Sequence, residues 1–306
     1  MPIEPALQRL LDHVPQMDWS LDPVSFRKQS AARLALLPVT TQLPKVADAS
    51  IPGPGGRIPV RFYHPSTEPD LPVTVFCHGG GFVIGDLESH DALCRTTAEE
   101  SGSIVVAVDY RLSPEHAFPA ALEDGFAAYA WALEHAREWG GDPSRIALAG
   151  DSAGASLSAG VCLMARDRGL PQPVLQLLWY PATGLDDTPS RRRLAEAPML
   201  GAQAMAFFAR HHFGAISRAD AVPYGAVSLA DDLSGLAPAY VLVAGNDPLL
   251  DEGVAYARQL RAAGVPAQLD VQEDMVHGFL SFANLVPSCR EAARPSLAAL
   301  RAALRH

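Results

Sequence analysis

Cysteine is scarce in this sequence of 306 residues. The four that occur are Cys77, Cys94, Cys162 and Cys289, and they form no C-x-x-C pair and no spacing typical of metal ligands. This pattern excludes a dense disulfide framework and argues against a zinc site. We therefore interpret the four residues as buried or partly buried thiols of a protein in a reducing cytoplasm.

Long hydrophobic runs are missing as well. No stretch reaches the roughly 18 consecutive apolar residues of a membrane-spanning helix. The first residues, MPIEPALQRLLDH, include early acidic side chains and lack the apolar centre of a signal peptide. We expect a cytoplasmic protein without a membrane span.

Positive charge is in deficit. Lys and Arg number 24 against 34 Asp and Glu, which gives a formal net charge of −10. A chain with this balance has little with which to neutralise a phosphate backbone, so we expect no nucleic-acid partner. The one dense basic run, residues 191–193, is short, and we interpret it as a solvated helix face or loop.

The residues that are abundant are apolar, and their order follows strands and helices. Hydrophobic residues make up 48% of the sequence and charged residues 19%, which is typical of a globular protein with a sizeable core. The length suits one large α/β domain with decorations or two ordinary domains. Residues 46–51 and 58–63 are strand-like and flank the turn sequence PGPGGR, which predicts an antiparallel hairpin.

From residue 73 onward, short apolar strands alternate with helical segments. The predicted strands are 73–77, 104–108, 145–149, 174–179, 239–243 and 267–271, and the predicted helices are 87–101, 119–138, 153–168, 251–263 and a last one from about 289. Near-continuous apolar strands separated by helices indicate a mostly parallel sheet that is covered on both faces. We therefore predict an α/β fold with a mostly parallel eight-stranded sheet flanked by helices.

Two helical regions fall outside this alternation. Residues 1–43 contain two short segments with helical periodicity, 5–11 and 23–37, whose apolar faces need a surface to pack on. Residues 186–232 are too many for an ordinary connection and contain a further helical segment, 202–213. We expect both regions to form a helical cap over a core made of residues 44–185 and 233–306.

The sequence GDSAG at residues 150–154 has the G-x-S-x-G pattern of a nucleophile elbow. A predicted strand precedes Ser152 and a small-residue helix follows, so the chain reverses sharply at the serine. Gly150 and Gly154 fit this turn, because a side chain at either position would collide with a neighbouring strand or helix. The turn places Ser152 at a helix N-terminus, where N–H groups favour developing negative charge. An isolated match also fits an ordinary strand-to-helix turn, so the assignment depends on partner residues.

A glycine loop, HGGGF at residues 78–82, follows the predicted strand 73–77. Consecutive glycines can bring their N–H groups to one point, here at the carboxyl end of a parallel strand, where open α/β sheets bind ligands. With the N–H of Ala153, these amides are expected to form an oxyanion hole. A phosphate-binding loop is the alternative, but the sequence has neither a G-K-[ST] ending nor a G-x-G-x-x-G frame. For His78 we expect a structural bond to the backbone that holds the glycines in shape.

An acid and a base should follow the serine in chain order. Asp247 comes just after a predicted strand, and His277 comes just after the next one. The 30 residues between them accommodate one helix and one strand, so both side chains should emerge at the sheet edge that carries Ser152. Ser152, His277 and Asp247 therefore predict a nucleophile, a general base and an orienting acid.

Other candidate acids and bases lie close by in the sequence. Asp251 and Glu252 are rival carboxylates, but they fall at the start of the next helix, where acidic residues commonly cap. His211 and His212 lie in the expected cap insertion, and we interpret them as surface or lid residues.

Five motifs in this order resemble the hormone-sensitive-lipase-like (family IV) carboxylesterases of the α/β-hydrolase superfamily. They are HGGGF at 78–82, DYRLSPEHAFPAALED at 109–124, GDSAG at 150–154, DPLLDE at 247–252 and HGF at 277–279. The resemblance implies an α/β-hydrolase fold with a helical cap. It also implies Ser152 as nucleophile, His277 as base, Asp247 as orienting acid, and the N–H groups of Gly80, Gly81 and Ala153 as the oxyanion hole.

Within the motif at 109–124, the block of residues 110–116 resembles the family's structural motif. Within it Ser113 stands where the family pattern leads us to expect alanine, and we expect Arg111 and Glu115 to form an internal ion pair.

The function that follows is hydrolysis of a small-molecule carboxylic ester by a Ser-His-Asp acyl-enzyme mechanism, with no cofactor and no metal. The resemblance implies short- to medium-chain acyl groups. An amidase or arylformamidase on the same triad is an alternative. A non-catalytic ligand receptor of the same fold is another, but such receptors lose a triad member and here all three candidates are present. The monomer and a homodimer both stay open as oligomeric states.

Overall fold

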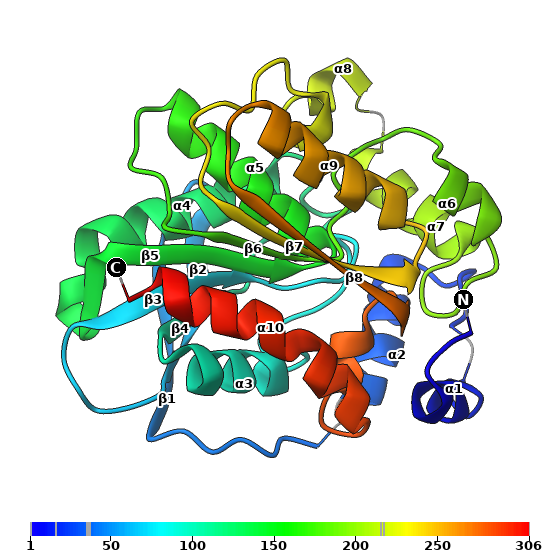
Figure 1. Ribbon diagram of the computed structural model, residues 1–306, viewed down its shortest axis with the longest axis horizontal. Coiled ribbons are helices and arrows are strands. Elements are labelled where there is room, and N and C mark those ends of the chain that lie inside the picture. The colour runs from blue at the N-terminus through cyan, green and yellow to red at the C-terminus, as the bar shows by residue number, and fades with distance from the viewer. Residues whose placement is uncertain (1, 16, 35–37, 215, 217, 306) are drawn as a thin grey trace.

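The computed structural model describes residues 2–15, 17–34, 38–214, 216 and 218–305. Its centre is one eight-stranded sheet with the strand order β1-β2-β4-β3-β5-β6-β7-β8 (Figure 1). Strand β2 pairs antiparallel with β1 and with β4, and all other neighbouring strands are parallel. The prediction of a mostly parallel eight-stranded sheet is confirmed.

The strands are β1 Lys45–Gly53, β2 Gly56–His64, β3 Leu71–Cys77, β4 Ile104–Val108, β5 Gly141–Asp151, β6 Gln176–Trp179, β7 Ala239–Asn246 and β8 Ala267–Val276. The α-helices are α1 Pro5–Leu11, α2 Pro23–Leu34, α3 Asp91–Ser101, α4 Ala120–His135, α5 Ala153–Asp167, α6 Pro189–Arg193, α7 Ala202–Phe213, α8 Arg218–Ala221, α9 Leu250–Ala262 and α10 Pro287–Ala303. The last three residues of the helix predicted over 23–37 lie outside the described residues.

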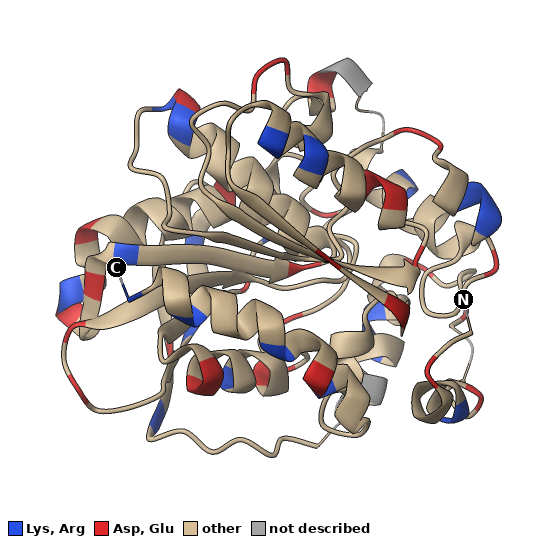
Figure 2. Cartoon of the chain, viewed as in Figure 1, with Lys and Arg blue, Asp and Glu red and all other residues tan. Residues whose placement is uncertain are grey.

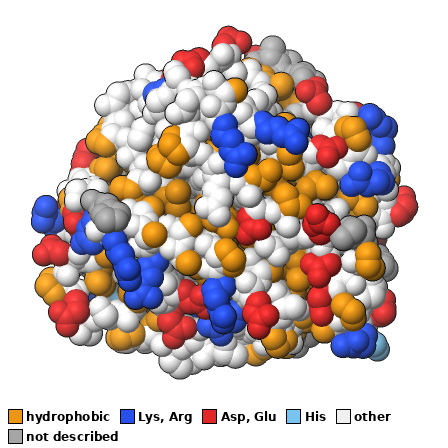
Figure 3. Space-filling model, viewed as in Figure 1, with side chains coloured by type: hydrophobic (Ala, Val, Ile, Leu, Met, Phe, Trp, Pro, Cys, Tyr) orange, Lys and Arg blue, Asp and Glu red, His pale blue; other side chains and the backbone are white. Residues whose placement is uncertain are grey.

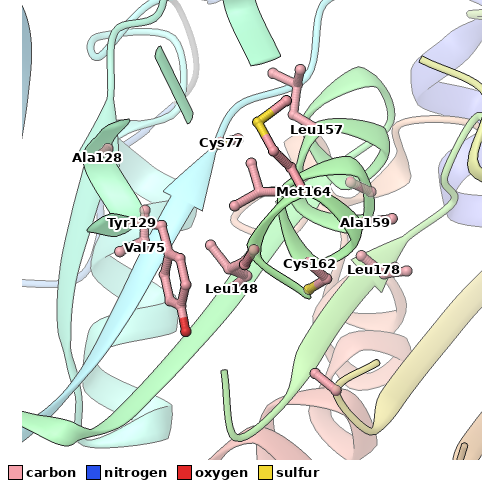
Figure 4. Packing of buried hydrophobic residues seen from close by; sticks show 14 of the residues in the cluster. Val75, Cys77, Ala128, Tyr129, Leu148, Leu157, Ala159, Cys162, Met164 and Leu178 are labelled. Atoms are coloured by element: carbon pink, nitrogen blue, oxygen red, sulfur yellow. The ribbon is translucent and has the colours of Figure 1, made fainter. Parts of the chain in front are cut away.

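The sheet is buried on both faces, and this explains why its central strands are continuously apolar. Every residue of β4 and of β6 is buried. Successive side chains point to opposite faces, so Val75 packs in one cluster with α4, α5 and α9, whereas Phe76 packs in a second cluster with α3 and α10. Figure 4 shows the first cluster, to which Val75 and Leu148 of the sheet and Met164 of α5 belong.

The edge strand β8 is longer than its apolar run predicts. It extends to Val276 instead of ending near Val271, and its side chains are alternately more and less exposed along much of its length. Val271 itself is 40% exposed. Because β8 is the last strand of the sheet and pairs with β7 on one side, polar residues such as Asp270 and Gln272 are tolerated there, and the apolar pattern stops before the strand does.

Helices α2, α6 and α7 gather at the end of the molecule toward which β7 and β8 point (Figure 1). Four aromatic rings join α2 and the loop before it to α7. The ring centroids of Trp19 and Phe26 are 4.8 Å apart, those of Phe26 and Phe207 are 4.7 Å apart, and Phe208 lies edge-on to Trp19. This aromatic cluster brings the N-terminal segment and the insertion after β6 together across about 180 residues of sequence.

Helix α1 packs elsewhere. Its buried Leu7 belongs to the cluster that holds Phe279 and α10, and the N–H of Glu4 donates to the carbonyl of Asp274 in β8, at 2.9 Å. None of the helices described in the structure is long and apolar enough to cross a lipid bilayer.

Candidate active site

Ser152 lies at the sharp junction between β5 and α5. Its backbone has φ 52° and ψ −120°, a conformation that is strained for any residue with a side chain. A Cβ at Gly150 would lie 2.6 Å from the Cys77 carbonyl oxygen, and one at Gly154 would overlap the same atom. Strand β3 therefore passes too close to the turn for any residue but glycine at these two positions.

The three predicted triad residues meet in space. His277 Nε2 is 2.8 Å from Ser152 Oγ, and His277 Nδ1 is 2.7 Å from Asp247 Oδ2. The other oxygen of Asp247, Oδ1, accepts the N–H of Leu249 at 2.8 Å. Asp247 is completely buried and His277 is 7% exposed.

These contacts fix the tautomer of the imidazole. An ionised carboxylate only accepts hydrogen bonds, so His277 Nδ1 carries the proton and donates it to Asp247. Nε2 is then left as the acceptor for the hydroxyl of Ser152. The hydroxyl of Ser152 therefore has a base, His277 Nε2, within hydrogen-bonding distance.

The glycine loop adopts backbone that suits glycine. Gly80 has φ 120° and Gly81 has φ 59°, and a Cβ on Gly80 would collide with the carbonyl of Ile84. The Gly80 carbonyl accepts the N–H groups of Val83 and Ile84 at 3.1 and 3.0 Å, which closes the loop on itself. Gly80, Gly81 and Ala153 all line the cavity beside Ser152. Their own N–H groups donate to no protein acceptor in the described part of the chain.

Asp151 is a site residue that sequence reasoning missed. Its Oδ1 accepts the N–H of Gly79 at 2.8 Å and lies 3.3 Å from His90 Nε2. Burial by itself would raise the pKa of Asp151, but the charge and hydrogen bond of His90 and the Gly79 N–H outweigh it, and the pKa lies below its usual range. The carboxylate thus ties the start of the glycine loop to the nucleophile turn. Its position directly before Ser152 was the available signal.

His78 has the structural contact predicted for it. Its Nδ1 is 2.7 Å from the carbonyl oxygen of Gly79, and its ring stacks on Tyr110 with centroids 4.2 Å apart. The hydroxyl of Tyr110 donates to the His78 carbonyl at 2.7 Å. Burial, with a further contribution from His90, lowers the pKa of His78 to about 4, so the ring is neutral near pH 7.

A cavity of about 490 Å³ opens onto Ser152 and His277. Its walls are mainly apolar, so the cavity suits a small apolar ligand better than a polar one. Members of the wall include Leu185, Met199, Leu200, Met205, Phe208, Phe213 and Leu249, and α2 contributes Ser30. No cluster of three or more His, Cys, Asp or Glu side chains that could hold a metal ion occurs within the described ranges.

His212 is buried, which corrects its interpretation as a surface histidine, whereas its interpretation as a lid residue stays a prediction. It is 2% exposed, and its ring stacks on Phe82 with centroids 3.8 Å apart. Its Nδ1 lies 3.1 Å from Ser113 Oγ. Because the serine hydroxyl donates to the His116 carbonyl, His212 Nδ1 acts as the donor to Ser113. His211, by contrast, is partly exposed at the end of the same helix.

We predict that two buried histidines lower the free energy of unfolding as the pH drops below about 6.5, before ordinary carboxylates begin to titrate. Burial lowers the pKa of His212 to about 3, and that of His78 to about 4, from an unfolded value of 6.5. Between about pH 6.5 and 4 the unfolded chain binds protons that the folded chain does not, so the free energy of unfolding falls as the pH drops. Each histidine contributes a slope approaching about 1.4 kcal/mol per pH unit.

Urea unfolding between pH 7 and pH 5 measures this slope. The variant His212→Gln should have a smaller slope than the wild type, because one of the two buried histidines no longer contributes to it. Parallel pH profiles for the variant and the wild type would contradict the account.

The rival carboxylates do not cap their own helix, which corrects that expectation. Asp251 Oδ2 accepts the N–H of Ser190 at 2.7 Å. Glu252 is buried, accepts the N–H groups of Thr183 and Gly184 at 2.8 Å each, and pairs with Arg191 at 2.7 Å. Both acids therefore fix the chain that leaves β6, and neither contacts the triad histidine.

The basic run 191–193 and the motif at 109–124 each need a correction. Arg191 is 21% exposed because of its pair with Glu252, so only its two neighbours are solvated as predicted (Figure 2 shows this basic helix, α6, at the edge of the molecule).

Arg111 pairs with the buried Asp124 at 2.8 Å instead of with Glu115. The predicted Arg111–Glu115 ion pair is wrong, because Arg111 turns toward α4 and Glu115 turns toward Arg27 of α2.

Comparisons with known proteins agree with the geometry. A family model described as an alpha/beta hydrolase fold matches residues 74–281. The esterase LipI of Mycobacterium tuberculosis is 45% identical over 306 residues, covering 99% of this chain and 95% of LipI. The ethyl acetate hydrolase of Pseudomonas putida is 39% identical over 243 residues, covering 78% of this chain and 76% of that enzyme. A hyperthermophilic esterase from the archaeon Pyrobaculum calidifontis, known from its structure, gives a TM-score of 0.91 at 39% identity over 99% of both chains. The chain therefore belongs to the α/β-hydrolase family, among the hormone-sensitive-lipase-like carboxylesterases that its motifs resemble.

Proposed function

We propose that this carboxylesterase hydrolyses esters of short- to medium-chain acids through an acyl-enzyme on Ser152. The observation that carries the proposal is the unbroken chain of hydrogen bonds from Ser152 Oγ through His277 to the buried Asp247. In the first step Ser152 Oγ attacks the ester carbonyl carbon while His277 Nε2 takes its proton. The imidazolium that forms lies against the carboxylate of Asp247, which stabilises its charge.

The negative charge on the former carbonyl oxygen needs donors that are already in place. The N–H groups of Gly80, Gly81 and Ala153 line the cavity next to Ser152 and have no protein acceptor in the described structure, so they are available to a substrate oxygen. Removal of one such donor typically costs about 10²–10³ in rate. As the intermediate collapses, the alcohol leaves with the proton from His277. Water then attacks the acyl carbonyl and gives a proton to His277. The bond to Ser152 Oγ breaks as that oxygen takes the proton back from His277, and the acid is released.

The size and walls of the cavity support small acyl groups. About 490 Å³ lined with Met, Leu and Phe side chains holds a modest apolar chain, and the helices α6 and α7 above it leave little space for a lipid aggregate. A relative that is 39% identical is an ethyl acetate hydrolase. The acyl part and the alcohol part of ethyl acetate each have two carbons.

We predict that kcat/KM over p-nitrophenyl esters passes through a maximum at short or medium acyl length. The butanoate should be hydrolysed at least about 10-fold faster than the palmitate, because a long chain exceeds the apolar space next to Ser152. A rate series from acetate to palmitate measures this. A rate that rises steadily to the longest chain would contradict the proposed substrate class.

An amide substrate separates this proposal from an amidase on the same triad. The matched pair is p-nitrophenyl butanoate and butanoyl p-nitroanilide, which carry the same acyl group. Cleavage of the ester alone supports the esterase, and cleavage of the anilide at a comparable rate would favour the amidase.

We propose that residues 1–43 and 186–232 act as a cap over a core of residues 44–185 and 233–306. Support comes from the aromatic cluster of Trp19, Phe26, Phe207 and Phe208, which joins α2 to α7 beside the cavity. Phe208 reaches the active site itself, because a Cβ on Gly81 would touch its ring. Helix α1 takes no part in that cluster, so its role in the cap rests on its continuity with α2.

We also propose a cytoplasmic protein that acts on small molecules and not on nucleic acid, as a monomer or a homodimer. All four cysteines are buried and free, which suits a reducing compartment. On the face shown in Figure 3, basic side chains stand in small groups between acidic and apolar ones, so this face offers no continuous surface for a phosphate backbone.

A further inference from the structure

The glycine loop is held from two sides. Asp151 binds the N–H of Gly79 at its start, and at its end the carbonyl of Val83 accepts a hydrogen bond from Arg27 Nε at 2.6 Å. Arg27 lies on α2, 56 residues before the carbonyl it binds. The N-terminal helix therefore contacts the backbone that carries the proposed oxyanion donors.

The same guanidinium also binds the motif at 109–124. Its Nη2 donates to the Ser113 carbonyl, and Nη1 and Nη2 form a two-pronged pair with Glu115 at 2.7 and 2.6 Å. The Ser113 N–H in turn donates to the Phe82 carbonyl at 2.9 Å. One side chain thus joins α2, residues 82–83 and residues 113–115 in a single hydrogen-bond network.

The geometry points to Arg27 as a positioning residue for the oxyanion hole, an inference that rests on the proposed function. The Val83 and Ile84 N–H groups donate to the Gly80 carbonyl, which shares one peptide plane with the Gly81 N–H, so the direction of that N–H is linked to the position of Val83. A shift at Val83 therefore re-aims the Gly81 N–H and moves the turn that carries Gly80. Phe26, the neighbour of Arg27, packs in the same small cluster as Val83, which brings α2 up against the loop.

Lysine cannot replace this arginine. Two carbonyls and a carboxylate are bound by three nitrogens of a rigid fork, whereas an ammonium group is a point charge on a flexible stem. Lysine could keep the pair with Glu115 and still lose the contact that fixes Val83.

The prediction concerns Arg27→Met and Arg27→Lys, assayed with p-nitrophenyl butanoate. Arg27→Met should lower kcat roughly 10- to 100-fold and change KM less than about 3-fold, because a misplaced donor weakens mainly the transition state. Arg27→Lys should lose at least about 5-fold in kcat for the same reason. The affinity for a trifluoromethyl ketone, which forms an oxyanion on the serine, should fall by the same factor as kcat/KM.

Two control variants separate positioning from general stabilisation. Glu115→Gln weakens the ion pair but leaves Arg27 its two carbonyls, and kcat should stay within about 3-fold of wild type. Arg145→Met is the matched control, because Arg145 is 26% exposed against 24% for Arg27 and likewise binds one carboxylate and two carbonyls. It lies in the first half of β5, at the opposite end from Ser152. It should lower Tm with kcat unchanged.

The outcomes are distinct. If the wild type is active and both Arg27 variants keep kcat within about 3-fold, or change only KM or Tm, the inference is overturned and the proposed function stands. If Arg27→Met does not fold, Arg27→Lys decides in the same way. A wild-type chain that cleaves no ester at all rejects the proposed function, and the inference with it.

Discussion

Ser152→Ala is expected to reduce kcat for ester hydrolysis by at least about 10⁴-fold. The change removes the oxygen that attacks the carbonyl, and no other hydroxyl in the described structure lies within hydrogen-bonding reach of His277 Nε2. The fold should persist, because the strained turn depends on Gly150 and Gly154 and not on the serine side chain. Kinetics with p-nitrophenyl butanoate and a thermal melt of the same preparation measure both effects.

Ser158→Ala is the matched control for that experiment. Ser158 lies on the same helix, and its hydroxyl donates to the Ala149 carbonyl in β5 at 2.9 Å, away from the cavity wall. The variant should lose some stability, about 1 kcal/mol for one buried hydrogen bond, and keep its kcat. A Ser152→Ala protein that retained more than a few per cent of wild-type turnover would rule out Ser152 as the nucleophile.

Asp247→Asn is expected to lower kcat by about 10⁴-fold, and the structure gives a specific reason. The Leu249 N–H donates to Oδ1, so the new side chain must turn its carbonyl oxygen toward Leu249. Its amide NH₂ group then faces His277 Nδ1 and donates to it. The imidazole is forced into the other tautomer, with the proton on Nε2, where it can no longer accept the proton of Ser152.

Asp251→Asn tests whether this effect is specific to Asp247. Asp251 is four residues later and accepts a backbone N–H, that of Ser190, from outside the site. Its conversion to asparagine should leave kcat within a few-fold of wild type. A larger loss for Asp251→Asn than for Asp247→Asn would mean that the wrong carboxylate has been assigned as the triad acid.

The placement of the triad could be predicted because each member follows a strand at once. Ser152, Asp247 and His277 stand directly after β5, β7 and β8, and parallel strands deliver their ends to one edge of the sheet. The local sequence around each residue therefore predicted its place in the site, even where the predicted end of a strand was wrong. His277 is adjacent to β8, although the apolar run ends five residues before the strand does.

Contacts between distant segments could not be predicted in this way. Arg111 has acidic neighbours on both sides in sequence, and the choice of Asp124 over Glu115 depends on how α4 packs against the sheet. Glu115 instead meets Arg27, 88 residues earlier. The helical periodicity of α7 likewise does not say which side of the helix faces Phe82, so the burial of His212 needed the structure.

The central claim, that Ser152 becomes covalently acylated, is tested most directly by labelling with diethyl p-nitrophenyl phosphate and locating the product by mass spectrometry. Activity should fall in proportion to labelling and vanish at one diethylphosphoryl group per chain. The group should lie on the peptide that contains Ser152, and the variant Ser152→Ala should not be labelled. Complete inactivation with the group on any other residue would contradict it.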